Sequence, residues 1–546
     1  FVRHQHVKRP RLAVAEHGLE DGPLVGRASE ARLDELGYEF RYREVPGRKH
    51  WWTDDSLGTT VSDDTALIAW IRDRRRVSGP RRVRFRTADL GAANRSHWVT
   101  IEQSGIAGRD AEIEALALHG VFLQKEYRRF YPAGEVTAHV IGFTNIDDVG
   151  QEGLELAYND WLQGEPGVKR VIRDGAGRVI EHVEVVRESE PGRDLNLTID
   201  RRLQYLAYRE LKSAVHKHGA LSGSVVLLDV ETGEVLAMVN YPSYNPNNLE
   251  NLRHEALRNR AVTDVFEPGS VMKPFVVAAA LETGRWRPDT PIDASPGWIS
   301  IGRFTAKDHH NYGPIDLTRL ITKSSNVAAV KVARDLEPEQ MWDTYDRFGF
   351  GDVTGTAFPG ESAGVLRNWR RWKRVEQDTL SYGYGLSVTA LQLAGAFAAL
   401  ANDGRRRSPS LIAGAENPVE SILDPGLARS VSAMLETVTG PEGTGKQARV
   451  ENYRVAGKTG TSRKSSAGGY KERRYIASFA GFAPVSAPRI AGVAVVNDPS
   501  NGEYYGGAVA APLFSAVMSG AMRLMNVAPD NYQRMVASND SAGGGQ

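Results

Sequence analysis

The chain has 546 residues, and its 68 Lys and Arg against 67 Asp and Glu give a formal net charge of +1. This length predicts about two to four domains. Hydrophobic residues make up 41% of the chain, enough for a real core, which excludes broad disorder. The balanced charge argues against a nucleic-acid-binding surface over the whole chain. The lack of cysteine excludes disulfides, thiol catalysis and zinc–thiolate sites.

Residues 1–118 contain no motif, and charged runs interrupt their helical and strand-like pieces. The densely basic stretch 72–86 is typical of a solvated arm, with contact to an acidic polymer or a membrane surface as the alternative. His254-Glu255 starts like a metalloprotease signature, but Arg258 stands where the second histidine belongs, so we expect neither metal nor cofactor. No window approaches the roughly 20 apolar residues that cross a bilayer, so we expect no membrane anchor within this chain.

Recognisable sequence patterns of folded structure begin at about residue 119. The glycines of residues 173–178 predict a tight turn between two strands, because glycine accepts positive φ. Pro191 and Gly192 mark a boundary, after which a second domain is expected over 196–528. The final segment, 529–546, is rich in Ser, Asn, Gly and Gln and is expected to be disordered.

Periodicity and turn chemistry predict the elements of the second domain. A β-hairpin is expected around Glu231-Thr232-Gly233, and other strands near the end of the domain. Two opening strands, a helical middle and closing strands indicate an α/β (α+β) layered domain whose sheet joins both ends of the domain. The expected helices cover 201–215, 270–282 and 317–333, and the expected strands cover 224–229, 234–239, 453–458, 475–482 and 489–497.

A first motif, Ser270-Val271-Met272-Lys273, follows a Pro-Gly pair at the start of the helix over 270–282. Positions i and i+3 share one helix face, so the Lys273 amine reaches the Ser270 hydroxyl. Serine is a weak nucleophile until a neighbour takes its proton, and lysine can do so only when burial or nearby positive charge lowers its pKa. Alone, this tetrapeptide is more often an N-cap serine with a solvated lysine.

A second motif, Ser324-Ser325-Asn326, interrupts the largely apolar helix expected over 317–333. Serine and asparagine weaken a helix interior, so their presence calls for a reason. Ser324 is a candidate to relay a proton between the Ser270 hydroxyl, the Lys273 amine and a leaving amine. Asn326 is a candidate to orient Lys273 and a substrate amide. Alone, the motif is also consistent with an exposed helix start.

A third motif, Lys458-Thr459-Gly460-Thr461, follows an expected strand. Gly460 lets a substrate lie close against the strand, since it has no side chain. Lys458 and the threonine hydroxyls suit a carboxylate, and the Thr461 N–H with that of Ser270 suits an oxyanion. Together, the three motifs in this order match the set of β-lactamases and penicillin-binding proteins. Residues 440–447 nearly fit a phosphate-binding loop, but they lack its Ser or Thr and a preceding strand, so a loop beside the site is preferred.

These motifs resemble those of class B penicillin-binding proteins, and of their septal type in particular. The resemblance covers about residues 119–528 and rests on further segments of the same kind. Those segments are 128–132, 150–155, 241–248, 382–389 and 504–508. It implies a penicillin-binding transpeptidase domain (a serine β-lactamase-like fold with an antiparallel sheet flanked by helices) over 196–528. It also implies an elongated pedestal domain of the dimerisation type over 119–195, whose N-terminal part, 1–118, matches poorly.

The resemblance implies a peptidoglycan D,D-transpeptidase that cross-links stem peptides through an acyl-serine at D-Ala-D-Ala and is acylated by β-lactams. The catalytic residues it implies are Ser270, Lys273, Ser324, Asn326 and Lys458. The substrate-binding residues it implies are Ser325, Thr459, Gly460, Thr461, Tyr505 and Gly506. It further implies attachment to the bacterial inner membrane, an active site in the periplasm, and partnership with a membrane glycan polymerase and other division proteins at the septum. No nucleic acid is implied.

Three alternatives share these motifs. A β-lactamase of class A also needs a Glu-x-x-x-Asn loop, which is absent between Asn326 and Lys458. A D,D-carboxypeptidase differs only in using water as the acceptor, which the sequence discriminates poorly. A β-lactam sensor would acylate without turnover, and turnover of a peptide donor would separate it from the enzyme.

Overall fold

The structure, a computed structural model, describes four strands before residue 127 by their backbone, and residues 129–531 apart from 146, 174–178, 251 and 465–472. The side chains of 173 and 179–183 are also outside the description. The described residues fall into two units. The larger unit holds residues 131–164 and those from 191 onward, and the smaller unit holds the four early strands and residues 165–190.

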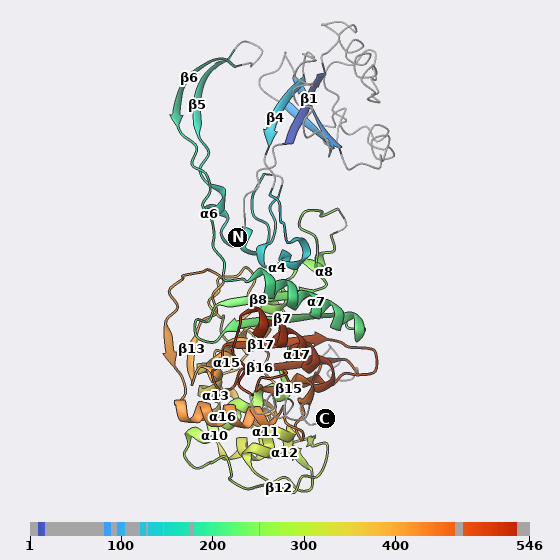
Figure 1. The fold of residues 1–546 in the computed structure, drawn as a ribbon, viewed down its shortest axis with the longest axis vertical. Coiled ribbons are helices and arrows are strands. Elements are labelled where there is room, and N and C mark those ends of the chain that lie inside the picture. The colour runs from blue at the N-terminus through green and yellow to red at the C-terminus, as the bar shows by residue number, and fades with distance from the viewer. Residues whose placement is uncertain are drawn as a thin grey trace, which may run out of the picture. The chain divides into compact units, whose positions relative to one another are not determined.

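The smaller unit contains a four-stranded sheet in the order β3-β2-β1-β4 (Figure 1). Strand β1 pairs in parallel with β2 and antiparallel with β4. A separate antiparallel hairpin, β5 with β6, flanks the predicted turn 173–178, most of which lies outside the described residues, as do most of 1–118 and the tail from 532. The bounds are β1 Arg9–Glu16, β2 Arg81–Ala88, β3 Ser96–Gln103, β4 Val121–Glu126, β5 Val168–Arg173 and β6 Val179–Arg187.

The larger unit is built on a five-stranded antiparallel sheet in the order β15-β16-β17-β7-β8 (Figure 1). Strands from the start and the end of the unit are therefore neighbours, which confirms the predicted layered fold. Strand β15 lies at one edge and β8 at the other. The bounds are β7 Ser222–Asp229, β8 Val235–Tyr241, β15 Ala456–Arg463, β16 Tyr475–Ala483 and β17 Ile490–Asn497.

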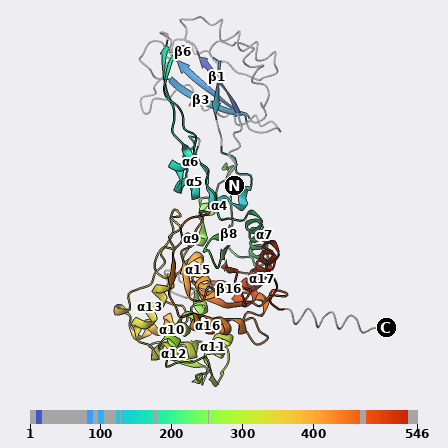
Figure 2. The same ribbon diagram turned by 60° about the vertical axis from the view of Figure 1, so that its left-hand side comes forward.

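Helices cover both faces of this sheet (Figure 2). Strand side chains alternate between two buried clusters, as the two-residue period of a strand requires: Val226 lies in one cluster and Val225 in the other. Helices α7 Arg201–Lys217 and α17 Gly506–Leu524 pack on one face, and α10 Lys273–Glu282, α15 Ala390–Ala401 and α16 Pro425–Thr437 belong to the cluster on the other.

The free edge of β8 is shielded by a side chain. The Gln204 amide nitrogen donates to the Met238 carbonyl at 2.8 Å, and the Gln204 side-chain oxygen accepts from the Met238 N–H at 2.8 Å. Gln204 thus imitates a pairing strand at one position and satisfies backbone groups that an exposed edge would leave open.

Residues 131–164 pack with the larger unit, although the sequence placed them in the pedestal. The Tyr244 hydroxyl donates to the Ala138 carbonyl at 2.9 Å, and His139 Nε2 lies 2.7 Å from the Ala256 carbonyl oxygen. The helices involved are η2 Gly134–Val136, α4 Ala138–Ile141, α5 Gly153–Ala157, α6 Asn159–Gln163, α8 His254–Leu257 and α9 Arg260–Thr263.

The helix predicted over 317–333 is wrong as a single element. It is divided into α11 Leu317–Lys323 and α12 Asn326–Asp335, because Ser324 adopts the left-handed conformation (φ 59°) and Ser325 is extended. The Ser325 hydroxyl accepts from the Ala328 N–H at 3.0 Å and so caps α12. The polar motif therefore forms the break between two helices.

The expectation that no apolar window approaches membrane-spanning length is also wrong. Among the described residues, α17 is a 19-residue helix apolar enough to cross a bilayer, yet 56% of its window is buried inside the structure. It packs against β16, β17 and α7, so its apolar character is that of a core helix.

The remaining elements surround the helical side of the larger unit. The helices are η3 Gly269–Met272, α13 Pro338–Arg347, η4 Trp369–Arg371, α14 Arg374–Leu380 and η5 Lys446–Ala448. The strands are β9 Ile292–Asp293, β10 Trp298–Ile301, β11 Phe304–Lys307, β12 Pro314–Ile315, β13 Arg405–Arg407 and β14 Val419–Ser421.

Candidate active site

Ser270 lies in η3, directly before α10. Gly269 has φ +60°, a conformation that glycine adopts freely, and its N–H donates to the Gly383 carbonyl at 3.1 Å. A Cβ on Gly383 would lie 2.0 Å from the Gly269 carbonyl oxygen, so only glycine fits there. The tight contact between these two backbones fixes the turn that presents Ser270.

The Lys273 amine joins the first two motifs. Its Nζ donates to Ser270 Oγ at 2.9 Å, Ser324 Oγ at 3.1 Å and Asn326 Oδ1 at 2.7 Å. It also lies 2.5 Å from the Ser324 carbonyl oxygen. Lys273 is fully buried at the start of α10. The four predicted residues therefore form one hydrogen-bonded group around a single amine.

Burial lowers the pKa of Lys273 to about 7, because the protein interior disfavours the charged ammonium, while the nearby Asp308 carboxylate opposes the shift. The amine is therefore substantially neutral near neutral pH. It can accept the proton of the Ser270 hydroxyl across a hydrogen bond that is already in place. This is the condition that the sequence could not test.

Asp308 holds the second motif in place, and the sequence analysis missed it. Its carboxylate accepts from the Ser325 hydroxyl at 2.6 Å, the Asn326 N–H at 2.5 Å and the Val327 N–H at 3.2 Å. It therefore satisfies the first N–H groups of α12. Asp308 follows β11 and precedes two histidines, and no spacing rule links it to a motif that begins 16 residues later at Ser324 (324 − 308).

The third motif lies inside β15, which runs from Ala456 to Arg463. The sequence analysis placed the motif after a strand, and this prediction is wrong. Lys458 is fully buried, and burial together with the charge of Lys273 holds its pKa well below its usual range. Thr459 Oγ1 lies 2.7 Å from Thr444 Oγ1, which places the loop 440–447 against the strand. A loop beside the motif is thus present, as preferred over a phosphate-binding loop.

The Thr461 N–H points away from the sheet, at the free edge of β15. β15 pairs with β16 alone, and the Arg463 N–H donates on the other side, to the Tyr384 hydroxyl at 3.1 Å. Residues two apart in a strand direct their N–H groups to the same side, so that of Thr461 also points to the free edge. A Cβ on Gly269 would lie 3.2 Å from the Thr461 carbonyl oxygen, so this edge faces the Ser270 turn.

Packing within the protein requires glycine at position 460, which the sequence analysis did not predict. A Cβ at this position would lie 2.2 Å from Ser478 Oγ and 2.6 Å from Val271 Cγ2. The neighbouring Gly506 is equally constrained, since its Cβ would lie 2.1 Å from the Gly460 carbonyl oxygen. The Gly506 N–H also donates to Thr461 Oγ1 at 2.9 Å. The two glycines thus permit close contacts within the protein itself.

Tyr505 belongs to a row of aromatic rings beside the motifs. Its ring stacks on Tyr504 at 4.4 Å between centroids, and Tyr504 stacks on Tyr475 at 4.1 Å. Tyr505 also meets His309 edge to face at 5.7 Å, next to Asp308. Tyr505 is 44% exposed, so its ring is accessible to a ligand.

Comparison with known proteins identifies the family. The model of the penicillin binding protein transpeptidase domain matches residues 223–519, more than half of the chain. This chain belongs to the penicillin-binding protein transpeptidase family. The model of the penicillin-binding protein dimerisation domain matches residues 107–197. Both domain types predicted from the sequence are confirmed, and the predicted boundaries at 119, 196 and 528 stay predictions.

Penicillin-binding proteins of several bacteria are similar over most of this chain. Peptidoglycan D,D-transpeptidase FtsI of Escherichia coli K12 is 47% identical over 420 residues, covering 77% of this chain and 71% of the relative. Probable peptidoglycan D,D-transpeptidase PbpC of Pseudomonas aeruginosa is 40% identical, covering 82% and 79%. The transpeptidase domain of Burkholderia pseudomallei penicillin-binding protein 3 superposes with a TM-score of 0.57 at 41% identity, covering 62% of this chain and 99% of that one.

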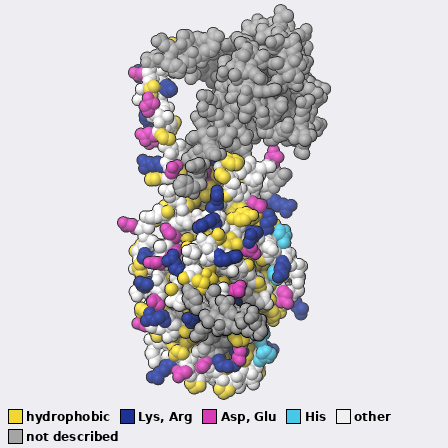
Figure 3. All heavy atoms as spheres, viewed as in Figure 1, with side chains coloured by type: hydrophobic (Ala, Val, Ile, Leu, Met, Phe, Trp, Pro, Cys, Tyr) yellow, Lys and Arg dark blue, Asp and Glu magenta, His cyan; other side chains and the backbone are white. Residues whose placement is uncertain are grey.

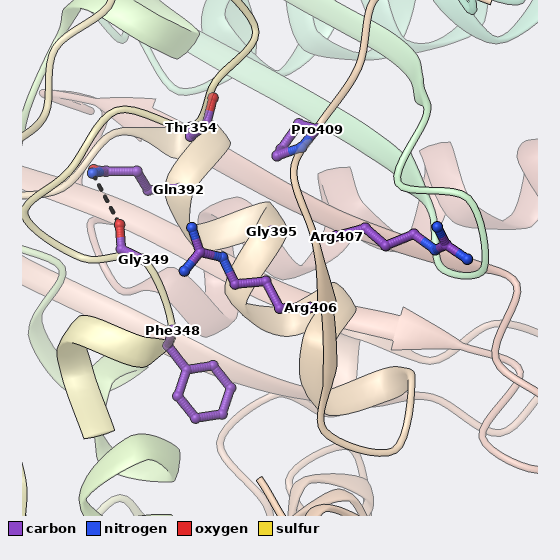
Figure 4. A pocket seen from close by; sticks show the side chains of 8 residues that line it. All are labelled: Phe348, Gly349, Thr354, Gln392, Gly395, Arg406, Arg407 and Pro409. Atoms are coloured by element: carbon purple, nitrogen blue, oxygen red, sulfur yellow. Dashed lines mark hydrogen bonds between the residues drawn. The ribbon is translucent and has the colours of Figure 1, made fainter. Parts of the chain in front are cut away.

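Elsewhere in this penicillin-binding protein, a small hollow lies apart from the motifs (Figure 4). The Gln392 side chain, which lines it, donates to the carbonyls of Gly349, Asp352 and Ala363, so its amide connects neighbouring loops. In the described parts of the chain, no group of three or more His, Asp or Glu residues has the arrangement of a metal site.

Replacing Ser325 with alanine is expected to destabilise this penicillin-binding protein without disabling the site. Ser325 is fully buried, and its hydroxyl already bonds to Asp308 and the Ala328 N–H, so the geometry favours capping over the predicted substrate contact. Loss of the cap should reduce the free energy of unfolding by about 1 kcal/mol. Denaturation and penicillin acylation are the measurements. A tenfold or greater loss of acylation with unchanged stability would instead support a substrate contact.

Proposed function

We propose that this chain is a peptidoglycan D,D-transpeptidase in which Ser270 forms the acyl-enzyme and Lys273 activates it. The observation that carries the proposal is the Lys273 amine: it is fully buried, lies 2.9 Å from Ser270 Oγ, and has its pKa lowered to about 7. A neutral amine in contact with a serine hydroxyl is what an acyl-transferring serine enzyme requires.

In the acylation step, the Ser270 oxygen attacks the carbonyl carbon of the penultimate D-Ala while its proton passes to the Lys273 amine. The N–H groups of Ser270 and Thr461 stabilise the oxyanion, in keeping with the outward direction of the latter at the β15 edge. The peptide C–N bond then breaks, and the leaving amine of the terminal D-Ala takes a proton from Lys273 through the Ser324 hydroxyl, which lies 3.1 Å from Lys273 Nζ.

In the second step, the amine of a neighbouring stem peptide attacks the ester at Ser270. It loses its proton through the same Ser324 and Lys273 route, and the Ser270 hydroxyl is regenerated. Asn326 holds Lys273 through its Oδ1, and its Nδ2 donates to the Lys307 carbonyl at 2.8 Å, which fixes the amide orientation. No atom of the protein is consumed, so one site serves both steps.

The terminal carboxylate of the donor is assigned to the third motif. The buried Lys458 amine lies next to Thr459, with its Nζ 3.2 Å from the Thr459 carbonyl oxygen. The hydroxyls of Thr459 and Thr461 stand at the edge strand and supply donors for an anion. Tyr505 and Gly506 border the same edge, which supports their assignment to substrate binding.

The cellular setting is proposed from the relatives. Similarity to FtsI of E. coli supports a role in division-septum synthesis, with a membrane glycan polymerase and other division proteins as partners. It also supports attachment to the inner membrane with the catalytic unit in the periplasm. The dimerisation-domain match over 107–197 supports a pedestal that carries contacts with such partners.

The test is turnover of a stem-pentapeptide donor in the presence of an amine acceptor. Mass spectrometry should detect released D-Ala and the new amide-linked product in equal amounts, and Ser270→Ala should abolish both. Release of D-Ala without the linked product would favour a carboxypeptidase. A penicillin ester at Ser270 with no donor turnover would favour a sensor, and rapid loss of that ester would favour a β-lactamase.

A further inference from the structure

A surface rich in arginine and aromatic side chains has no role in the chemistry described above. We define it as Arg303 and Phe304, at the turn between β10 and β11, together with the η4 segment that follows Asn368. That segment contributes Trp369, Arg370, Arg371 and Lys373. Phe304 is 60% exposed, and all four cations are exposed. Over the face drawn in Figure 3, basic and acidic side chains are interspersed.

The local structure presents these side chains outward. Trp372 anchors the segment: its Nε1 donates to the Arg367 carbonyl at 2.9 Å, and its ring packs against the core on the helical side of the sheet. Asn368 caps η4 by accepting from the Arg370 N–H at 3.1 Å. The Arg370 guanidinium lies 4.8 Å from the centre of the Trp369 ring. The turn is thus fixed while its cations face solvent.

The charges of this surface are not balanced by neighbouring carboxylates. Within the described part of the chain, no acidic side chain forms a salt bridge with any of its four cations. The acidic residues of α14 have other charge partners. Glu376 accepts from the Lys373 backbone N–H at 2.8 Å but pairs with the Arg367 guanidinium at 3.1 Å, and Asp378 pairs with Arg334 at 2.7 Å. In a chain of net charge +1, this concentration of positive charge favours an anionic partner.

The β10–β11 hairpin connects this surface to the active site through contacts at its two ends. The β10–β11 hairpin has its turn beside α14, since a Cβ on Gly302 would lie 3.0 Å from Val375 Cγ2. The other end of the hairpin holds the Lys307 carbonyl, which accepts from Asn326 Nδ2. A four-residue strand spans about 13 Å, so the turn of the hairpin lies about one short strand away from Asn326. A glycan strand whose peptide stem is bound at Ser270 extends beyond that stem and can therefore contact the surface.

We propose that this surface binds the polymeric substrate, a glycan strand that carries carboxylate-bearing peptide stems. The cations suit the stem carboxylates, and the exposed Phe304 ring, with the half-buried Trp369 ring, suits the apolar faces of sugar rings. Its position one hairpin length from Asn326 favours a substrate over an anionic lipid surface, which shares the charge but requires no proximity to the site. The inference rests on the proposed transpeptidase function and assigns its substrate a second point of attachment.

The test compares polymeric and small donors. The triple variant Arg370→Gln, Arg371→Gln, Lys373→Gln is expected to bind purified peptidoglycan strands about tenfold more weakly at low salt, because three exposed charge contacts are lost together. Its binding should also depend less on salt. Acylation by penicillin and turnover of a soluble pentapeptide donor should match the unmodified protein, because neither ligand carries the glycan strand and the neighbouring stems that are proposed to occupy the surface.

The matched control removes three exposed cations on the opposite face of the sheet, Arg201→Gln, Lys217→Gln and Arg523→Gln, on α7 and α17. Equal polymer binding by both triple variants would overturn the proposal. So would loss of binding to anionic phospholipid vesicles with peptidoglycan binding unchanged, which would assign the surface to a membrane. Absence of small-donor turnover in the unmodified protein would instead refute the proposed function, so the two failures are distinguishable.

Discussion

Replacing Lys273 with methionine is expected to lower the rate of Ser270 acylation by penicillin by about 10²–10⁴-fold, the range that a positioned general base contributes. Methionine preserves most of the volume but removes the amine that bonds to Ser270, Ser324 and Asn326. In the unmodified protein, acylation should rise with pH through about 7, since the neutral amine is the active form. Stopped-flow acylation across pH is the measurement.

Lys323→Met is the matched control. Lys323 immediately precedes the second motif but pairs with Glu442 at 3.0 Å and does not contact Ser270. This pair is partly exposed, and exposed pairs contribute little, so acylation should change by no more than about threefold. An equal loss in both variants would mean that acylation depends on general packing around the motif and not on the Lys273 amine.

Asp308→Asn is expected to weaken both the fold and the site. The carboxylate bonds to the Ser325 hydroxyl and to two N–H groups at the start of α12, and asparagine retains only one acceptor oxygen. The free energy of unfolding should fall by about 1–3 kcal/mol. Because the Asp308 charge raises the pKa of Lys273, its removal should lower that pKa further. The acidic limb of the acylation profile should then move to lower pH.

The control for this change in the Lys273 pKa is a carboxylate that does not act on Lys273. Two charged groups face Lys273: Asp308 from the loop after β11, and Lys458 from β15. The two lysines, if both were charged, would repel each other. Asp316→Asn removes a comparable carboxylate that caps α11 through the Arg319 N–H but is not among the charges acting on Lys273. Asparagine caps a helix about as well as aspartate, so this variant should change the free energy of unfolding little and leave the pH profile unmoved. A profile that is identical in Asp308→Asn and the unmodified protein would contradict the electrostatic role of Asp308.

The motif residues were predictable because local spacing determines much of their geometry. Ser270 and Lys273 share a helical face at any i, i+3 separation, and the strands that join the two ends of the unit follow from alternation and turn chemistry. The order of the three motifs then gave the family, which the comparisons confirm. What the motifs could not give is the burial of Lys273, since burial is created by α10, α12 and β15 together.

Other features depend on contacts between distant segments. The helix expected over 317–333 is divided at Ser324 because the Asp308 carboxylate, from a different loop, stabilises the start of α12. The sequence explained Gly460 by room for a substrate, whereas the structure shows Ser478 and Val271 in the way of any side chain. In each case the deciding atom lies far away in the sequence, so local pattern could not identify it.

The central claim, a Ser270 nucleophile activated by a buried amine, is tested most directly by intact-protein mass spectrometry after incubation with a penicillin. We expect the unmodified protein to gain the mass of one intact penicillin, stable for hours, with the label on the peptide that contains Ser270. Ser270→Ala should gain none. A stable adduct on Ser270→Ala, or a label on another peptide, would contradict the account.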